Sequence, residues 1–142
     1  MTTEVQIGRN RVHLELLRKV ISRSASWAGM TRKDTLETEE AVSQVCTAAM
    51  ENCAEDVDTP LTVSISADPS SVTVDIRESF AGYLSLWSDY GDEAMAQTRQ
   101  LVDAVECTTA GNCATIRLTK RARSAEPSQD MVPVYAVSSL QS

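Results

Sequence analysis

The clearest pattern in the chain is an alternation of apolar and polar side chains in two neighbouring segments. The apolar members are Leu61, Val63, Ile65, Val72, Val74 and Ile76. A period of two is typical of strands that bury one face. Residues 67–71 between them combine Asp, Pro and Ser, which favour a turn. The two segments therefore predict a β-hairpin.

Two longer segments carry apolar residues at helical spacing. The first follows Asn10, whose side chain is suited to cap a helix, and stops at Gly29. The second is expected to be capped by Asp34 or Thr35. Its apolar positions recur every three or four residues and are Val42, Val45, Cys46, Ala49 and Cys53. Both segments predict amphipathic helices.

The remaining predicted elements are a short strand, a third helix and a second hairpin. A short strand is expected at residues 3–7, a helix at 92–102 and a second hairpin from 104–107 and 113–118. Strand, helix, helix, hairpin, loop, helix, hairpin predicts an α+β fold. We expect a two-layer sandwich with the helices on one face of a mixed, mostly antiparallel sheet.

Composition separates one domain from a tail. Residues 1–123 have the pattern of a single folded domain, and residues 124–142 read as a linker and C-terminal tail. Within the tail, residues 131–137 are compatible with a short strand, which Pro133 would restrict to a sheet edge.

The charge balance limits the classes of partner. The net charge is −7, so the average field repels nucleic acid and anionic lipid and suits a basic protein partner. The cluster Lys120-Arg121-Ala122-Arg123 is a weak nucleic-acid signal. No apolar run is long enough to span a membrane, and the first residues lack signal-peptide character. We expect a cytoplasmic, bacterial-type protein that binds neither membrane nor nucleic acid directly.

The cysteines do not form a metal-binding pattern. No Cys-x-x-Cys pair occurs and the chain has one histidine, so no metal site is expected. Cys107 and Cys113 flank the second predicted turn and would face each other across it. A disulfide there is geometrically conceivable, whereas a cytosolic setting favours free thiols.

Residues 41–52 carry the most specific pattern, A-V-S-Q-V-C-T-A-A-M-E-N. They resemble the nucleotide-box helix of RsbW-type anti-sigma factors, serine kinases of the GHKL ATPase superfamily. That family's pattern is roughly A-V-S-E-A-C-T-N-A-I-E-H. The 61–76 hairpin and the closing run A-T-I-R-L-T-K-R at 114–121 are similar to the family's corresponding strands. The resemblance implies a GHKL, or Bergerat-like, fold.

The resemblance also implies that the nucleotide chemistry is degenerate. Gln44 stands where the family has its catalytic Glu, and Ala48 stands where an Asn holds the magnesium of Mg-ATP. Asn52 lies one turn further along the helix. It would replace that ligand only if the metal moved.

Two further nucleotide-binding devices are altered. In the family's D-x-G-x-G box this chain has Glu78, Phe80 and Gly82, so only the second glycine is kept. In the glycine-rich lid it has Asp92 and Ala94, and a carboxylate there would repel phosphate. We therefore expect no catalytic residue, no bound cofactor and loss of ATP binding.

Three functions remain open. The first is a regulatory protein-binding module that resembles an anti-sigma factor of a partner-switching pathway, with a sigma factor or an anti-sigma-factor antagonist as partner and homodimerisation possible. The second is an active kinase that uses Mg-ATP to phosphorylate the antagonist. The third is an interaction domain that shares only the fold. Without the resemblance, Gln44 and its neighbours would read as an ordinary polar helix face.

Carried over from the family, the first helix and the loop before the last helix are the surfaces expected to meet a partner. Their candidate partner-binding residues are His13, Leu17, Tyr83, Trp87 and Tyr90. The plainer interpretation makes His13 a surface histidine and assigns the aromatic residues, Trp27 included, to core and loop packing.

Overall fold

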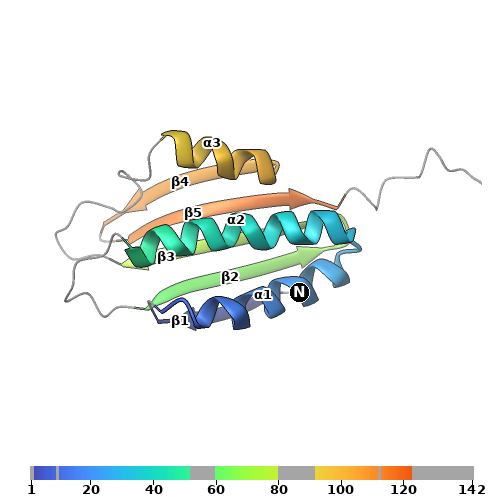
Figure 1. Ribbon diagram of the computed structural model, residues 1–142, viewed down its shortest axis with the longest axis horizontal. Coiled ribbons are helices and arrows are strands. Elements are labelled where there is room, and N and C mark those ends of the chain that lie inside the picture. Colours follow the sequence, from blue (N-terminus) through green and yellow to red (C-terminus); the bar gives the residue numbers. More distant parts are fainter. Residues whose placement is uncertain (1, 9, 52–59, 80–91, 112, 123–142) are drawn as a thin grey trace, which may run out of the picture.

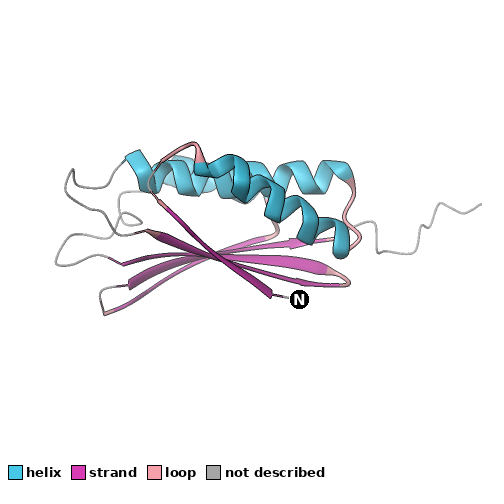
Figure 2. Cartoon of the chain, turned by 90° about the horizontal axis from the view of Figure 1, so that it is seen from below, coloured by secondary structure: helices cyan, strands magenta, loops and turns pink. Residues whose placement is uncertain are grey.

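The computed structural model describes residues 2–8, 10–51, 60–79, 92–111 and 113–122. Over these residues, three helices cover one face of a five-stranded sheet (Figures 1 and 2). The elements are β1 (Thr2–Ile7), α1 (His13–Trp27), α2 (Arg32–Glu51), β2 (Leu61–Asp68), β3 (Ser71–Ser79), α3 (Asp92–Leu101), β4 (Ala104–Ala110) and β5 (Cys113–Arg121). The predicted α+β two-layer fold is confirmed. The predicted linker and tail, residues 124–142, lie outside the described residues.

The strands are ordered β1-β2-β3-β5-β4, and each described pairing is antiparallel. No parallel pair therefore occurs among these strands. Two hairpins, β2–β3 and β4–β5, lie side by side because β5 pairs with β3 on one side and with β4 on the other.

The β2–β3 hairpin has the predicted turn chemistry. One carboxylate oxygen of Asp68, Oδ1, accepts hydrogen bonds from the Ser70 amide at 2.7 Å and from the Ser70 hydroxyl at 2.9 Å. The other, Oδ2, accepts from the Ser71 hydroxyl at 3.1 Å. These bonds favour the charged form and lower the pKa of Asp68.

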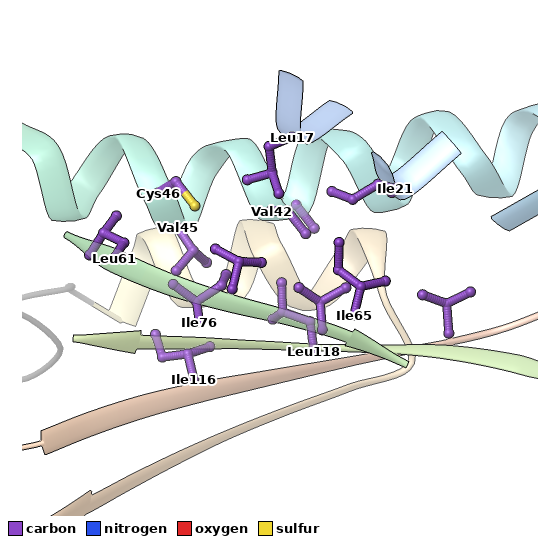
Figure 3. Close-up of a cluster of buried hydrophobic side chains, with 14 of the residues drawn as sticks. Leu17, Ile21, Val42, Val45, Cys46, Leu61, Ile65, Ile76, Ile116 and Leu118 are labelled. Atoms are coloured by element: carbon purple, nitrogen blue, oxygen red, sulfur yellow. The ribbon is translucent and has the colours of Figure 1, made fainter. Parts of the chain in front are cut away.

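The core lies between the helices and the inner face of the sheet. Every second residue of the central strands is buried, as the alternation predicts. Figure 3 shows the packing of this layer, to which the helices contribute Leu17, Ile21, Val42, Val45 and Cys46. The outer face carries polar side chains, including the Asp75–Arg117 ion pair at 2.8 Å.

The helix ends correct two predictions. The hydroxyl of Thr31 accepts a hydrogen bond from the Asp34 amide at 3.1 Å, so Thr31 caps α2, and neither Asp34 nor Thr35 does. Asn10 does not cap α1 either, because the N-cap is Val12, which makes no side-chain cap hydrogen bond. The Asn10 side chain instead accepts from the Val12 amide at 2.9 Å in the turn before the helix. Gly29 has the positive φ of 79° expected where α1 stops.

Cys107 and Cys113 do not face each other across the hairpin. Across β4 and β5, Cys107 lies opposite Ile116 and Cys113 lies opposite Ala110, and no disulfide joins them. The hairpin is longer than the sequence suggested, and β4 extends to Ala110. The two thiols are therefore out of register by three residues.

None of the described helices combines the length and apolar character needed to cross a membrane.

Candidate functional site

Gln44, at the position where the resemblance predicts a missing catalytic Glu, lies at a contact between two helices. Gln44 of α2 accepts, through its side-chain oxygen, a hydrogen bond of 3.0 Å from the hydroxyl of Thr98 in α3. Thr98 is completely buried. The amide nitrogen of Gln44 donates to Glu40 at 3.4 Å, one turn earlier on α2. The side chain of Gln44 therefore joins α2 to α3 and is held at both of its polar atoms.

Ala48 follows Gln44 by one turn on α2 and is half-buried. Its methyl group has no lone pair to offer to a metal ion. Asn52, the residue expected one turn further, lies outside the described residues. Ala48 itself therefore cannot supply the oxygen that the family uses to hold magnesium.

Glu78 lies near the end of β3, opposite Ala114 of β5, and its side chain is only 4% exposed. It is on the inner, helix-covered face, because it continues the buried alternation of Val74 and Ile76. The position expected to face an adenine is thus occupied by a buried carboxyl group. Phe80 and Gly82 lie outside the described residues.

The lid positions fall at the beginning of α3. This helix begins at Asp92, so the positions of Asp92 and Ala94 are in its first turn. The resemblance predicts the glycine-rich lid at these positions, and the described backbone is helical there.

The first helix presents a different apolar surface from the one predicted. Leu17 is 1% exposed and belongs to the core, so it is not a surface residue. Its neighbour Leu16 is 56% exposed, Trp27 is 53% exposed, and Val12 is also exposed. Trp27 therefore does not pack in the core. Tyr83, Trp87 and Tyr90 lie outside the described residues.

His13 packs against the end of β1. Its Nδ1 accepts a hydrogen bond of 2.9 Å from the Gly8 amide. A Cβ added at Gly8 would lie 3.1 Å from the imidazole ring, so the small residue permits this contact. His13 is exposed and fixes the start of α1, as the plainer interpretation expected of a surface histidine.

A buried lysine that the sequence analysis treated as a surface charge joins three elements. Lys120 of β5 is 3% exposed, and its ammonium group donates to Glu37 of α2 at 2.8 Å. It also donates to the carbonyl of Leu101, the last residue of α3, at 2.6 Å, and lies 3.8 Å from Asp34. Its inward position follows from the alternation of β5, in which Ile116, Leu118 and Lys120 share a face. Lys120 is therefore not part of a basic surface.

A shallow groove, which we call the α2–α3 groove, lies beside this lysine. It has a volume of about 570 Å³ and is lined mainly by Arg18, Arg32, Lys33, Leu36, Glu40 and Leu101. A second hollow of about 440 Å³ adjoins it, sharing Lys33 and Glu37, and Lys120 lines its wall. The groove follows the first turns of α2, away from Ala48 near the other end of that helix.

Comparisons with known proteins bear on the fold. No family model and no curated protein matches the chain. Among solved structures, the chain is similar to the crystal structure of the RsbU and RsbW domains of Rv1364c from Mycobacterium tuberculosis, with a TM-score of 0.66 and 17% sequence identity. The match covers 85% of this chain and 32% of that chain. The likeness shows a shared fold, which agrees with the RsbW-like order of helices and strands predicted from the sequence.

Proposed function

We propose that this protein is a regulatory binding module of the anti-sigma-factor type that no longer uses ATP. The fold shared with an RsbW-containing structure supports the general class of partner-switching module. A sigma factor or an anti-sigma-factor antagonist is the proposed partner, and it would bind the exposed apolar surface of α1.

The hydrogen bond from Thr98 to Gln44 is the observation that best supports the proposed loss of kinase activity. A carboxylate at position 44 could accept a proton, whereas a primary amide is not a base at neutral pH. The Gln44 oxygen is already used in the contact between α2 and α3. Ala48 adds no metal ligand, and magnesium is needed to compensate the charge of a transferring phosphoryl group.

In such a module, the affinity for a partner would not depend on whether ATP or ADP is bound. Binding would instead depend on competition between partners or on their abundance. This feature distinguishes the proposal from the active-kinase alternative, in which nucleotide controls the choice of partner.

Thermal melting with and without millimolar Mg-ATP tests the loss of nucleotide binding. A ligand present at about 100 times its dissociation constant adds about 2.7 kcal/mol, which raises the melting temperature by several degrees. We expect no change in melting temperature. A clear rise would contradict the proposal and favour the kinase.

Titration of the chain with purified sigma factors and anti-sigma-factor antagonists tests the binding role. We expect saturable binding of one of these proteins that is insensitive to Mg-ATP. Absence of binding across both groups would favour an interaction domain that has only the fold in common with anti-sigma factors.

A further inference from the structure

The α2–α3 groove has a charge opposite to that of the molecule as a whole. Arg32 and Lys33 are the first two residues of α2 and are both exposed. Cations at the start of a helix face the positive end of the helix dipole, which disfavours them. Within the described part of the chain, neither forms an ion pair, although the protein carries a net charge of −7.

The acidic side chains of the groove are already engaged. Glu37 accepts a hydrogen bond from Lys120, and Glu40 lies 3.8 Å from Arg18. Arg32 and Lys33 therefore dominate the local field. Beside them, Leu36 is 47% exposed, and Leu101 adds apolar surface to the groove. The surface thus favours a ligand that is both acidic and apolar.

The chain itself leaves the described fold next to this surface. β5 ends at Arg121, and the Ala122 amide donates to the carbonyl of Ser70 at 2.8 Å, which fixes the point of exit. Lys120, two residues earlier, lines the adjoining hollow. Figure 1 shows that β5 ends and α2 begins at the same end of the sandwich.

The residues that follow have the matching composition. The only charged side chains in 124–137 are Glu126 and Asp130. Residues 131–137 read M-V-P-V-Y-A-V, an uninterrupted apolar run that is unlike the polar composition of a solvated tail. Such a run is stabilised when it covers an apolar surface.

The connection is long enough for this segment to reach the groove. Asp130 follows Ala122 by eight positions, which span up to about 27 Å when extended. The stretch of α2 that lines the groove, residues 32–40, is about 12 Å long.

We propose that residues 126–137 of this chain bind in the α2–α3 groove. The carboxylates of Glu126 and Asp130 pair with Arg32 and Lys33, and the apolar run covers Leu36 and Leu101. The groove is then occupied by a segment of the same chain. The inference does not depend on which protein binds α1 or on whether ATP binds.

Hydrogen exchange of the full chain, followed by mass spectrometry, tests this proposal. The amides of residues 131–137 should exchange at least about tenfold more slowly than those of a synthetic peptide of residues 124–137. Lys33→Glu and Asp130→Lys should each remove this protection. The double variant, which reverses both charges, should restore it.

Lys19→Glu is the matched control, since Lys19 is an exposed lysine of α1 that does not line the groove. It should leave the protection unchanged. Circular dichroism and melting of each variant check folding, and a glutamate at position 33 suits the start of a helix.

Three outcomes would overturn the proposal. Exchange in the full chain at the rate of the free peptide would show that the segment does not bind. Protection that survives Lys33→Glu would place the segment on another surface, such as the exposed strand β4. Protection that disappears on dilution would show binding to a second copy of the chain.

Discussion

Gln44 and Ala48 lie one turn apart on α2, at the two positions where the resemblance predicts that a catalytic base and a metal ligand are missing. The amide of Gln44 accepts a hydrogen bond from Thr98 and is not a base at neutral pH. The methyl group of Ala48 suits a helix and has no lone pair for a metal ion. Both side chains are therefore compatible with packing between the helices, and neither offers the chemistry that a kinase would need.

Restoring the metal ligand alone should not restore nucleotide binding. We expect Ala48→Asn to show no rise in melting temperature with millimolar Mg-ATP, because the box at Glu78 and the lid positions at the start of α3 remain altered. Asn is a weaker helix former than Ala, so the variant should lose roughly 0.7 kcal/mol of its free energy of unfolding. Its melting temperature without nucleotide should therefore be slightly lower. The wild-type chain in the same buffers is the control. A rise of several degrees in the variant alone would show that Ala48 is the sole obstacle.

Cys46 gives a prediction about pH. Burial raises the pKa of its thiol to about 12, from an ordinary value of 9.0. The unfolded chain therefore loses this proton at a lower pH than the native protein does, and stability falls as the pH rises from about 9 to about 12. Cys46→Ala should reduce the loss of unfolding free energy over this range by up to about 1.4 kcal/mol per pH unit. Urea unfolding of the wild-type chain and of Cys46→Ala across this pH range measures both slopes. Equal slopes would contradict the assignment of this pH dependence to Cys46.

At the scale of elements, Lys120 connects parts of the fold that are far apart in sequence. It joins the end of β5 to the first turns of α2 and to the last carbonyl of α3. A cation suits the negative end of a helix, and the two carboxylates of α2 offset the cost of burying it. The contact keeps the beginning of α2 and the end of α3 together at the edge of the groove.

Lys120→Met should therefore destabilise the protein strongly. Removal of one member of a buried ion pair typically costs about 3–5 kcal/mol, and here Glu37 and the Leu101 carbonyl would each lose the hydrogen bond that Lys120 donates. Urea unfolding of the variant measures this loss. Arg117→Met, which breaks an exposed pair with Asp75, is the control and should cost about 1 kcal/mol or less. Similar losses in both variants would show that Lys120 does not join these elements.

The same lysine explains why the cap of α2 was predicted wrongly. Asp34 is a favoured capping residue and stands just before the apolar positions of the helix. In the structure it lies inside the helix, buried, and faces Lys120, which is 3.8 Å away. No local pattern reveals a partner that comes so much later in the chain. Thr31, the actual cap, carries only the weaker local signal of a threonine three residues before an acid.

For the whole molecule, the spacing of apolar residues predicted the two layers. Each helix or strand buries the face on which its apolar residues recur. The alternation of β2 and β3 specified both strands and their turn, and helical spacing specified the inner face of α2. The α1 surface was harder, because Leu16 and Leu17 are adjacent leucines and only packing against the sheet decides which is buried. The groove also escaped prediction, since it is formed by residues from three separate helices.

These two leucines allow binding and folding to be separated in the whole protein. Leu16→Glu should leave urea unfolding nearly unchanged, because the side chain is already exposed. It should weaken the complex with the sigma factor or antagonist that binds in the titration by more than about 1.4 kcal/mol, a tenfold change. Leu17→Ala should instead lower stability by about 2–5 kcal/mol through the cavity that it leaves in the core.

Below its unfolding transition, the Leu17→Ala protein should still bind the partner with nearly wild-type affinity, since the outer surface of α1 is intact. Wild-type affinity in Leu16→Glu would place the partner on a different surface. Loss of stability in Leu16→Glu would mean that Leu16 contributes to the fold. Only weakened binding with unchanged unfolding assigns the exposed side of α1 to the partner and its buried side to the core.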